Sequence, residues 1–185
     1  MATLQRVFEE AFLSFLREDQ KLIFTDAHEQ SLCARLAMSL ERVAKKHGLE
    51  GYSVDAEYNR NYGQVKTIID DQHREISITC DIILHSRGEN PNADNLIAIE
   101  MKKAEAKDAR KNSDRNRLRA LTKPCHEVYP LASADRKYVC GYELGYFIDM
   151  SRQEGCAVIE VYASGDLQES YVQRLSGEIT ERKKT

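Results

Sequence analysis

The stretch Leu96-Ile97-Ala98-Ile99-Glu100-Met101-Lys102 decides the fold of this 185-residue chain. It opens with four apolar residues and closes with a carboxylate and an ammonium two positions apart. A short apolar run is typical of a buried strand. Because side chains alternate between the two faces of a strand, Glu100 and Lys102 share a face. The sequence therefore predicts an acid and a base side by side at the end of a buried strand.

The segment before this strand predicts a neighbour for it. Residues 75–85 alternate in character, and one face collects apolar side chains: Ile76, Ile78, Cys80, Ile82 and Leu84. Asp81 lies in mid-strand on the opposite face. Residues 87–95 are rich in Gly, Asn, Pro and Asp, which is typical of a connecting loop. If the two strands pair, the carboxylates of Asp81 and Glu100 converge.

Two converging carboxylates repel each other unless a proton or a cation lies between them. Sites of this kind suit Mg²⁺, which binds through one or two carboxylates, water and substrate phosphate. Such an ion activates water and polarises a phosphoryl group. Lys102 would orient the attacking water or offset negative charge. The alternative is a surface Glu–Lys pair at a strand end and an aspartate that pairs with an arginine.

The remaining elements complete an α/β (α+β) pattern. A capping box is expected at Asp26 and Glu29, at the start of the second helix, and Gly48 ends that helix. The tail is expected to fray. We expect helices at 2–19, 26–47 and 113–122, strands at 52–58, 65–69, 75–85, 96–102, 138–149 and 156–162, and a charged tail at 177–185. This order predicts a single domain over 1–185, with a mixed central sheet flanked by helices.

The two central strands resemble the PD-(D/E)XK nuclease superfamily. The matching stretches are Ile78-Thr79-Cys80-Asp81-Ile82-Ile83-Leu84 and the strand at 96–102. The α-β-β-β-α-β order over approximately 26–149 is also similar, and Cys80 stands where the family has its name-giving proline. The resemblance implies a restriction-endonuclease-like three-layer core with an extra N-terminal helix.

The resemblance also implies an activity and its residues. Asp81 and Glu100 would ligate Mg²⁺ or Mn²⁺ together with the Met101 carbonyl, and Lys102 would assist the water. Glu29 would complete the site, because the family often has a glutamate on its first core helix; its capping role is an equal alternative. The implied reaction is phosphodiester hydrolysis in nucleic acid, DNA rather than RNA. The alternative function is a catalytically silent nucleic-acid-binding or protein-interaction module that keeps the nuclease fold.

A basic segment follows the charged strand end. Residues 102–123 carry a net charge of +6, whereas the whole chain carries −3. Five of its residues are candidates for nucleic-acid binding: Lys103, Lys107, Arg115, Arg117 and Arg119. The alternative is a solvated helix face, the usual fate of a charge run. A homodimer and a place in a larger nuclease assembly both stay open.

The five cysteines and the hydropathy bear on the compartment. The cysteines, Cys33, Cys80, Cys125, Cys140 and Cys156, lack the short spacing of a zinc knuckle and are expected to be reduced and mostly buried. No apolar run approaches the ~20 residues that span a bilayer. Acidic residues Glu9 and Glu10 lie where a signal peptide would be apolar. We therefore expect a cytoplasmic protein without a membrane partner.

Overall fold

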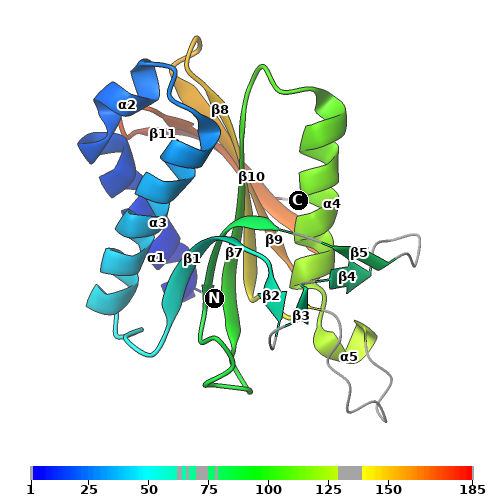
Figure 1. Ribbon diagram of the computed structural model, residues 1–185. Coiled ribbons are helices and arrows are strands. Elements are labelled where there is room, and N and C mark those ends of the chain that lie inside the picture. Colours follow the sequence, from blue (N-terminus) through cyan, green and yellow to red (C-terminus); the bar gives the residue numbers. More distant parts are fainter. Residues whose placement is uncertain are drawn as a thin grey trace.

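The protein is described by a computed structural model that covers residues 2–61, 64–65, 67–69, 75–77, 79–128 and 139–184. Within these residues one seven-stranded sheet has the order β1-β6-β7-β8-β9-β10-β11. Its neighbouring strands are antiparallel except β7 and β8, which run parallel. Helices pack on both faces of the sheet (Figure 1). The expected mixed α/β fold is confirmed.

The bounds of the elements are as follows. The sheet consists of β1 (Ser53–Tyr58), β6 (Cys80–His85), β7 (Asn95–Lys103), β8 (Leu144–Ser151), β9 (Cys156–Ala163), β10 (Asp166–Arg174) and β11 (Ile179–Lys184). Two small hairpins consist of β2 (Arg60–Asn61) with β3 (Gln64–Val65) and β4 (Thr67–Ile69) with β5 (Glu75–Ser77). The helices are α1 (Ala2–Glu18), α2 (Gln20–Phe24), α3 (Glu29–Lys46), α4 (Asp108–Thr122) and α5 (Cys125–Val128).

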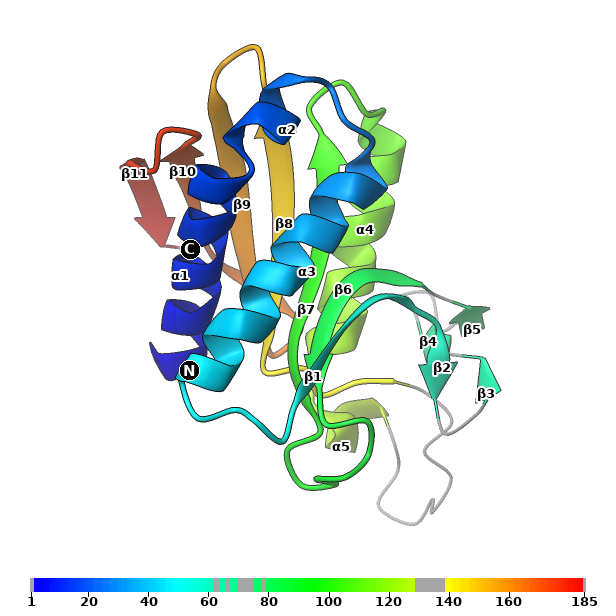
Figure 2. The same cartoon turned by 60° about the vertical axis from the view of Figure 1, so that its left-hand side comes forward.

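One face of the sheet is covered by α1 and α3, which Figure 2 shows side by side. Helix α1 forms where the apolar spacing predicts it, and its phenylalanines are buried in the larger core. The ring of Phe8 stacks on that of Tyr146 in β8 with 3.6 Å between centroids. Ser39 of α3 donates a hydrogen bond to the Ala11 carbonyl of α1 at 2.9 Å. The two helices therefore form one layer over the middle of the sheet.

The opposite face is covered by α4. Its buried Leu118 and Leu121 pack in a second core with Ile83, Ala98 and Phe147 of the sheet. This helix lies in the connection between β7 and β8. A parallel pair needs such a crossover, because a tight turn can join only antiparallel strands. The helix that follows the charged strand is thus held directly beside it.

The expected strand over 75–85 is wrong as a single element. β5 pairs with β4 outside the main sheet, and the sheet strand begins only at Cys80. Cys80 packs in the α4 core, whereas Ile82 and Leu84 pack in the α1–α3 core. Period-two alternation thus fails within β6, between Cys80 and Ile82, which the apolar pattern ran across. Ile78 lies outside the described residues.

Two helix starts also differ from expectation. Helix α3 begins at Glu29, with His28 at the N-cap, so the Asp26 capping box is wrong. Asp26 has a φ of 59° and its carboxylate pairs with Lys103 at 2.9 Å instead. Helix α4 begins at Asp108 rather than at 113. The first turns of α4 consist mostly of polar residues, so they lack the periodic apolar residues from which a helix is predicted.

The C-terminal part of the sheet was not expected. In β10 the inward positions include Glu169 and Gln173 beside Tyr171, which hides the alternation of a half-buried strand. The tail forms β11, paired with β10, and is not frayed. All six residues of β11 are exposed, so no apolar signal predicts it.

A disulfide joins Cys125 and Cys140, which corrects the expectation that all five cysteines are reduced. It ties α5 to the segment that leads into β8. Cys33, Cys80 and Cys156 are free thiols. Among the described residues, no helix is long and apolar enough to cross a membrane.

Candidate active site

The antiparallel register of β6 and β7 brings the predicted acids together. The paired register ends with Ile82 opposite Ile99, and Asp81 and Glu100 are the next residues along β6 and β7. Asp81 lies beside the end of β7, because its Oδ2 accepts the Met101 backbone N–H at 2.9 Å. Asp81 borders α3 in a pocket and Glu100 bonds Arg117 of α4, yet the two acids are near enough for the charge of Asp81 to act on Glu100. The expected strand pairing is therefore confirmed, and both acids lie at the end of β7 from which the chain continues into α4.

Lys102 lies at the centre of the site. Its Nζ donates hydrogen bonds to Glu29 Oε1 at 2.8 Å, to the Met101 carbonyl oxygen at 2.8 Å and to Asp81 Oδ2 at 3.4 Å. Its Nζ is also 3.2 Å from Asp114 Oδ2. The same Asp81 oxygen accepts the Met101 backbone N–H at 2.9 Å. The first turn of α3, the start of β6 and the end of β7 therefore meet at one ammonium.

Glu100 is fully buried and is held from the other side by α4. Its Oε1 accepts a hydrogen bond from Arg117 Nη1 at 2.6 Å. Its Oε2 is buried and has no hydrogen-bond partner within the described structure. A buried carboxylate oxygen without a partner is costly unless it accepts a hydrogen bond or binds a cation. Within the described residues, Glu100 Oε1 is thus hydrogen-bonded to Arg117, whereas Glu100 Oε2 has no hydrogen-bond partner.

Asp114 joins these two groups, and sequence reasoning missed this role. Its Oδ1 lies 3.2 Å from Arg117 Nη1 and its Oδ2 pairs with Lys102. The sequence interpretation assigned Asp114 only to the start of a helix. A helix start at Asp108 would have exposed the signal, because Asp114, Leu118 and Leu121 then fall on one buried face. We call Glu29, Asp81, Glu100 and Asp114, with Lys102 and Arg117, the carboxylate site.

The electrostatics of the carboxylate site follow from its burial. Burial raises the pKa of Glu100 well above its ordinary value, and the charge of Asp81 adds to the effect against the opposing Arg117. Burial also raises the pKa of Asp114. For Lys102 burial alone would lower the pKa, but Asp81 and the hydrogen bond to Glu29 outweigh it and raise the pKa. Lys102 therefore stays a cation, and Glu100 is stabilised by further positive charge.

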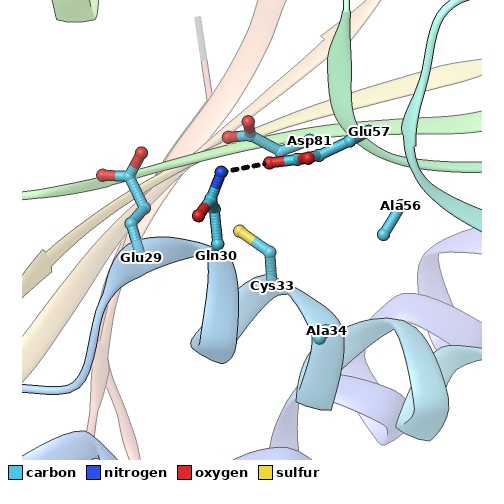
Figure 3. Close-up of a pocket in the computed structure, with 7 residues that line it drawn as sticks. All are labelled: Glu29, Gln30, Cys33, Ala34, Ala56, Glu57 and Asp81. Atoms are coloured by element: carbon cyan, nitrogen blue, oxygen red, sulfur yellow. Dashed lines mark hydrogen bonds between the residues drawn. The ribbon is translucent and has the colours of Figure 1, made fainter.

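A pocket of about 260 Å³ opens beside the carboxylate site. Figure 3 shows Glu29 and Gln30 on the first turn of α3, facing Glu57 and Asp81. Gln30 Nε2 donates to Glu57 Oε1 at 2.7 Å. Cys33, Ala34 and Ala56 complete its lining. The site is therefore reachable from solvent along the side of α3.

The residues present suit a hard divalent cation in their chemistry. Asp81, Glu100 and the Met101 carbonyl supply oxygen donors, which Mg²⁺ and Mn²⁺ prefer. The buried Glu100 Oε2 without a partner is the observation that supports this fit. In the described part of the chain, however, no three acidic, His or Cys side chains are gathered as a ready metal site. The Lys102 ammonium already bonds Asp81 and the Met101 carbonyl oxygen.

The arginines of the basic segment are mostly engaged by the protein itself. Arg115 binds Glu160 of β9 through two nitrogens and lies over the Phe147 ring. Arg117 holds Glu100, and Arg119 lies 3.8 Å from the exposed Asp166. Contact of these three arginines with phosphate stays a prediction, and it would require each of them to exchange a protein partner for phosphate. Of the other two candidates, Lys103 pairs with Asp26 and Lys107 is exposed.

Comparisons of the chain with protein-family models, curated proteins and solved structures found no match.

Proposed function

We propose that this chain is a metal-dependent nuclease of the restriction-endonuclease-like fold. One observation carries the proposal: Asp81 and Glu100 directly follow the last opposed pair of β6 and β7, Ile82 with Ile99, and Lys102 contacts Asp81 two residues beyond Glu100. The order α3, β1, β6, β7, α4, β8 supports the same fold, since it follows the α-β-β-β-α-β order of the superfamily. Glu100 is fully buried, and its Oε2, which has no hydrogen-bond partner among the described residues, supports a role as a cation ligand rather than as a solvated surface charge.

The residues have distinct roles in this proposal. Asp81, Glu100 and the Met101 carbonyl would hold Mg²⁺ or Mn²⁺, which activates water and offsets charge on the phosphodiester. Lys102, kept as an ammonium by its acidic neighbours, would orient the water or stabilise the developing negative charge. Glu29 positions Lys102 through its 2.8 Å hydrogen bond. Helix α4 fixes Glu100 through Arg117.

The test is cleavage by the purified protein. Plasmid DNA and a single-stranded RNA are incubated with Mg²⁺ or Mn²⁺, with and without chelator, and the wild type is compared with Asp81→Asn, Glu100→Gln and Lys102→Met. We expect metal-dependent cleavage of DNA that each substitution abolishes. Asp149→Asn is the matched control, because Asp149 pairs with Lys111 and not with Lys102. Equal cleavage by all variants would assign the activity to a contaminant.

A second candidate function has its own observation. Lys102 and Arg117 already neutralise much of the acidic charge, as in a protein that keeps the fold without turnover. A silent nucleic-acid-binding or interaction module would bind a partner but cleave nothing with any divalent ion. Isothermal titration with Mn²⁺ separates the two, because the silent module should bind no Mn²⁺ at the carboxylate site.

A further inference from the structure

Lys102 and a divalent cation would compete for the same oxygens. The Lys102 Nζ is 2.8 Å from the Met101 carbonyl oxygen and 3.4 Å from Asp81 Oδ2. The proposed function assigns both of these oxygens to the metal ion. Two cations a few ångströms apart repel strongly in a partly buried site. Lys102 must therefore leave these oxygens when the ion binds.

Asp114 offers the ammonium an alternative acceptor. Its Oδ2 is 3.2 Å from Lys102 Nζ, yet it is buried and accepts no hydrogen bond from any residue that the structure describes. The two atoms are thus close enough to attract but not aligned. The other oxygen, Oδ1, is occupied by Arg117 of the next helical turn. Arg117 therefore fixes Asp114 with one oxygen directed at Lys102.

We infer that Asp114 is a positioning residue, which holds the Lys102 ammonium away from Asp81 and the Met101 carbonyl oxygen when a divalent cation binds there. The inference rests on the proposed function. Glu29 keeps its hydrogen bond to Lys102, so the ammonium is retained beside the ion between α3 and α4. Helix α4 thereby raises the affinity of the site for the divalent cation, although Asp114 itself does not contact the cation.

The test is a double-mutant cycle on Mn²⁺ affinity, measured by isothermal titration without substrate. The variants are Asp114→Asn, Lys102→Met and the double variant, with Asp149→Asn as control. Lys102→Met should bind Mn²⁺ at least as tightly as wild type, because the competing charge is gone. Asp114→Asn should weaken binding about tenfold with Lys102 present, and less than about twofold in the Lys102→Met background.

The outcomes separate the inference from the proposed function. A loss of the same size in both backgrounds would mean that Asp114 acts only as a nearby negative charge, and would overturn the inference. So would unchanged affinity in Asp114→Asn, weaker binding in Lys102→Met, or an equal loss in Asp149→Asn. In each of these cases Mn²⁺ binding by the wild type would still support the proposed nuclease function. Absence of Mn²⁺ binding by the wild type would overturn both.

Discussion

Arg117 Nη1 donates to Glu100 Oε1 at 2.6 Å across the boundary between α4 and the sheet, and the Glu100 side chain is 0% exposed. This pair links the basic helix to the acidic strand end. It also gives Arg117 a structural task in place of the phosphate contact that the charge run indicated.

Removal of the Arg117 guanidinium should destabilise the protein. Arg117→Ala leaves the Glu100 carboxylate buried without its partner, and such losses cost about 3–5 kcal/mol. Arg119→Ala is the control, since its pair with Asp166 is exposed and worth less than about 1 kcal/mol. Urea unfolding followed by circular dichroism measures both. Equal losses in the two variants would contradict a special role for the buried pair.

The protein should lose stability in acid through Asp55. Its hydrogen bonds with Arg87, and then with His85, hold the pKa of Asp55 below its ordinary 3.8, against the effect of burial. The folded state therefore binds this proton less readily than the unfolded state, so the stabilisation is present above pH 3.8 and lost as the pH falls below it. Thermal midpoints of wild type and Asp55→Asn should converge between pH 6 and pH 3. A constant gap between them would contradict the assignment.

If the chain binds duplex DNA, exposed lysines and arginines rather than paired ones should set the salt dependence. Lys107 and Arg110 are exposed at the start of α4. Replacing both by alanine should flatten the slope of log affinity against log salt by about 2, near one counterion for each charge. The measurement uses Ca²⁺ in place of Mg²⁺ to prevent turnover. Arg115→Ala, which releases Glu160, should leave the slope unchanged; a flatter slope there would show that Arg115 exchanges its partner for phosphate.

Thiol titration should find the disulfide. In the denatured, unreduced protein three of the five cysteines should react, because Cys125 and Cys140 are joined. Their sequence separation is 15, and closing a loop of that length contributes about 3 kcal/mol in the chain-entropy account. Reductant should therefore lower the free energy of unfolding of wild type but not of Cys125→Ser. Five reactive thiols would show that the bond does not form.

The sequence predicted the centre of the molecule better than its periphery. Asp81, Glu100 and Lys102 were found because charges stand out beside apolar strands, and the pairing of β6 with β7 then brings the three residues to one end of the sheet. The partners of these residues were not found. Asp114 and Arg117 reach β7 from another helix, and a pattern within one segment holds no information on such contacts.

The last two strands of the sheet, β10 and β11, explain the other errors. In β10 the side chains of Glu169 and Gln173 are buried, so polar residues occupy positions where the sequence pattern requires apolar ones. Arg182 and Gln5 contact Glu169 there. β11 buries none of its side chains and is held by its pairing with β10. Hydrophobic periodicity reports burial rather than hydrogen bonding, and it misses strands of this kind.

The composition of β11 affects how copies of this chain can associate through the edge of the sheet. An outermost strand offers unpaired backbone groups to any extended chain that approaches. Here that approach meets Glu181, Arg182, Lys183 and Lys184, all exposed. A second copy that aligned its own β11 parallel and in register would bring each lysine against the same lysine, and like charges directly opposite destabilise a strand pair. The sheet is therefore protected against parallel, in-register growth from molecule to molecule along β11, and concentrated solutions of the protein should resist fibrous association of that kind.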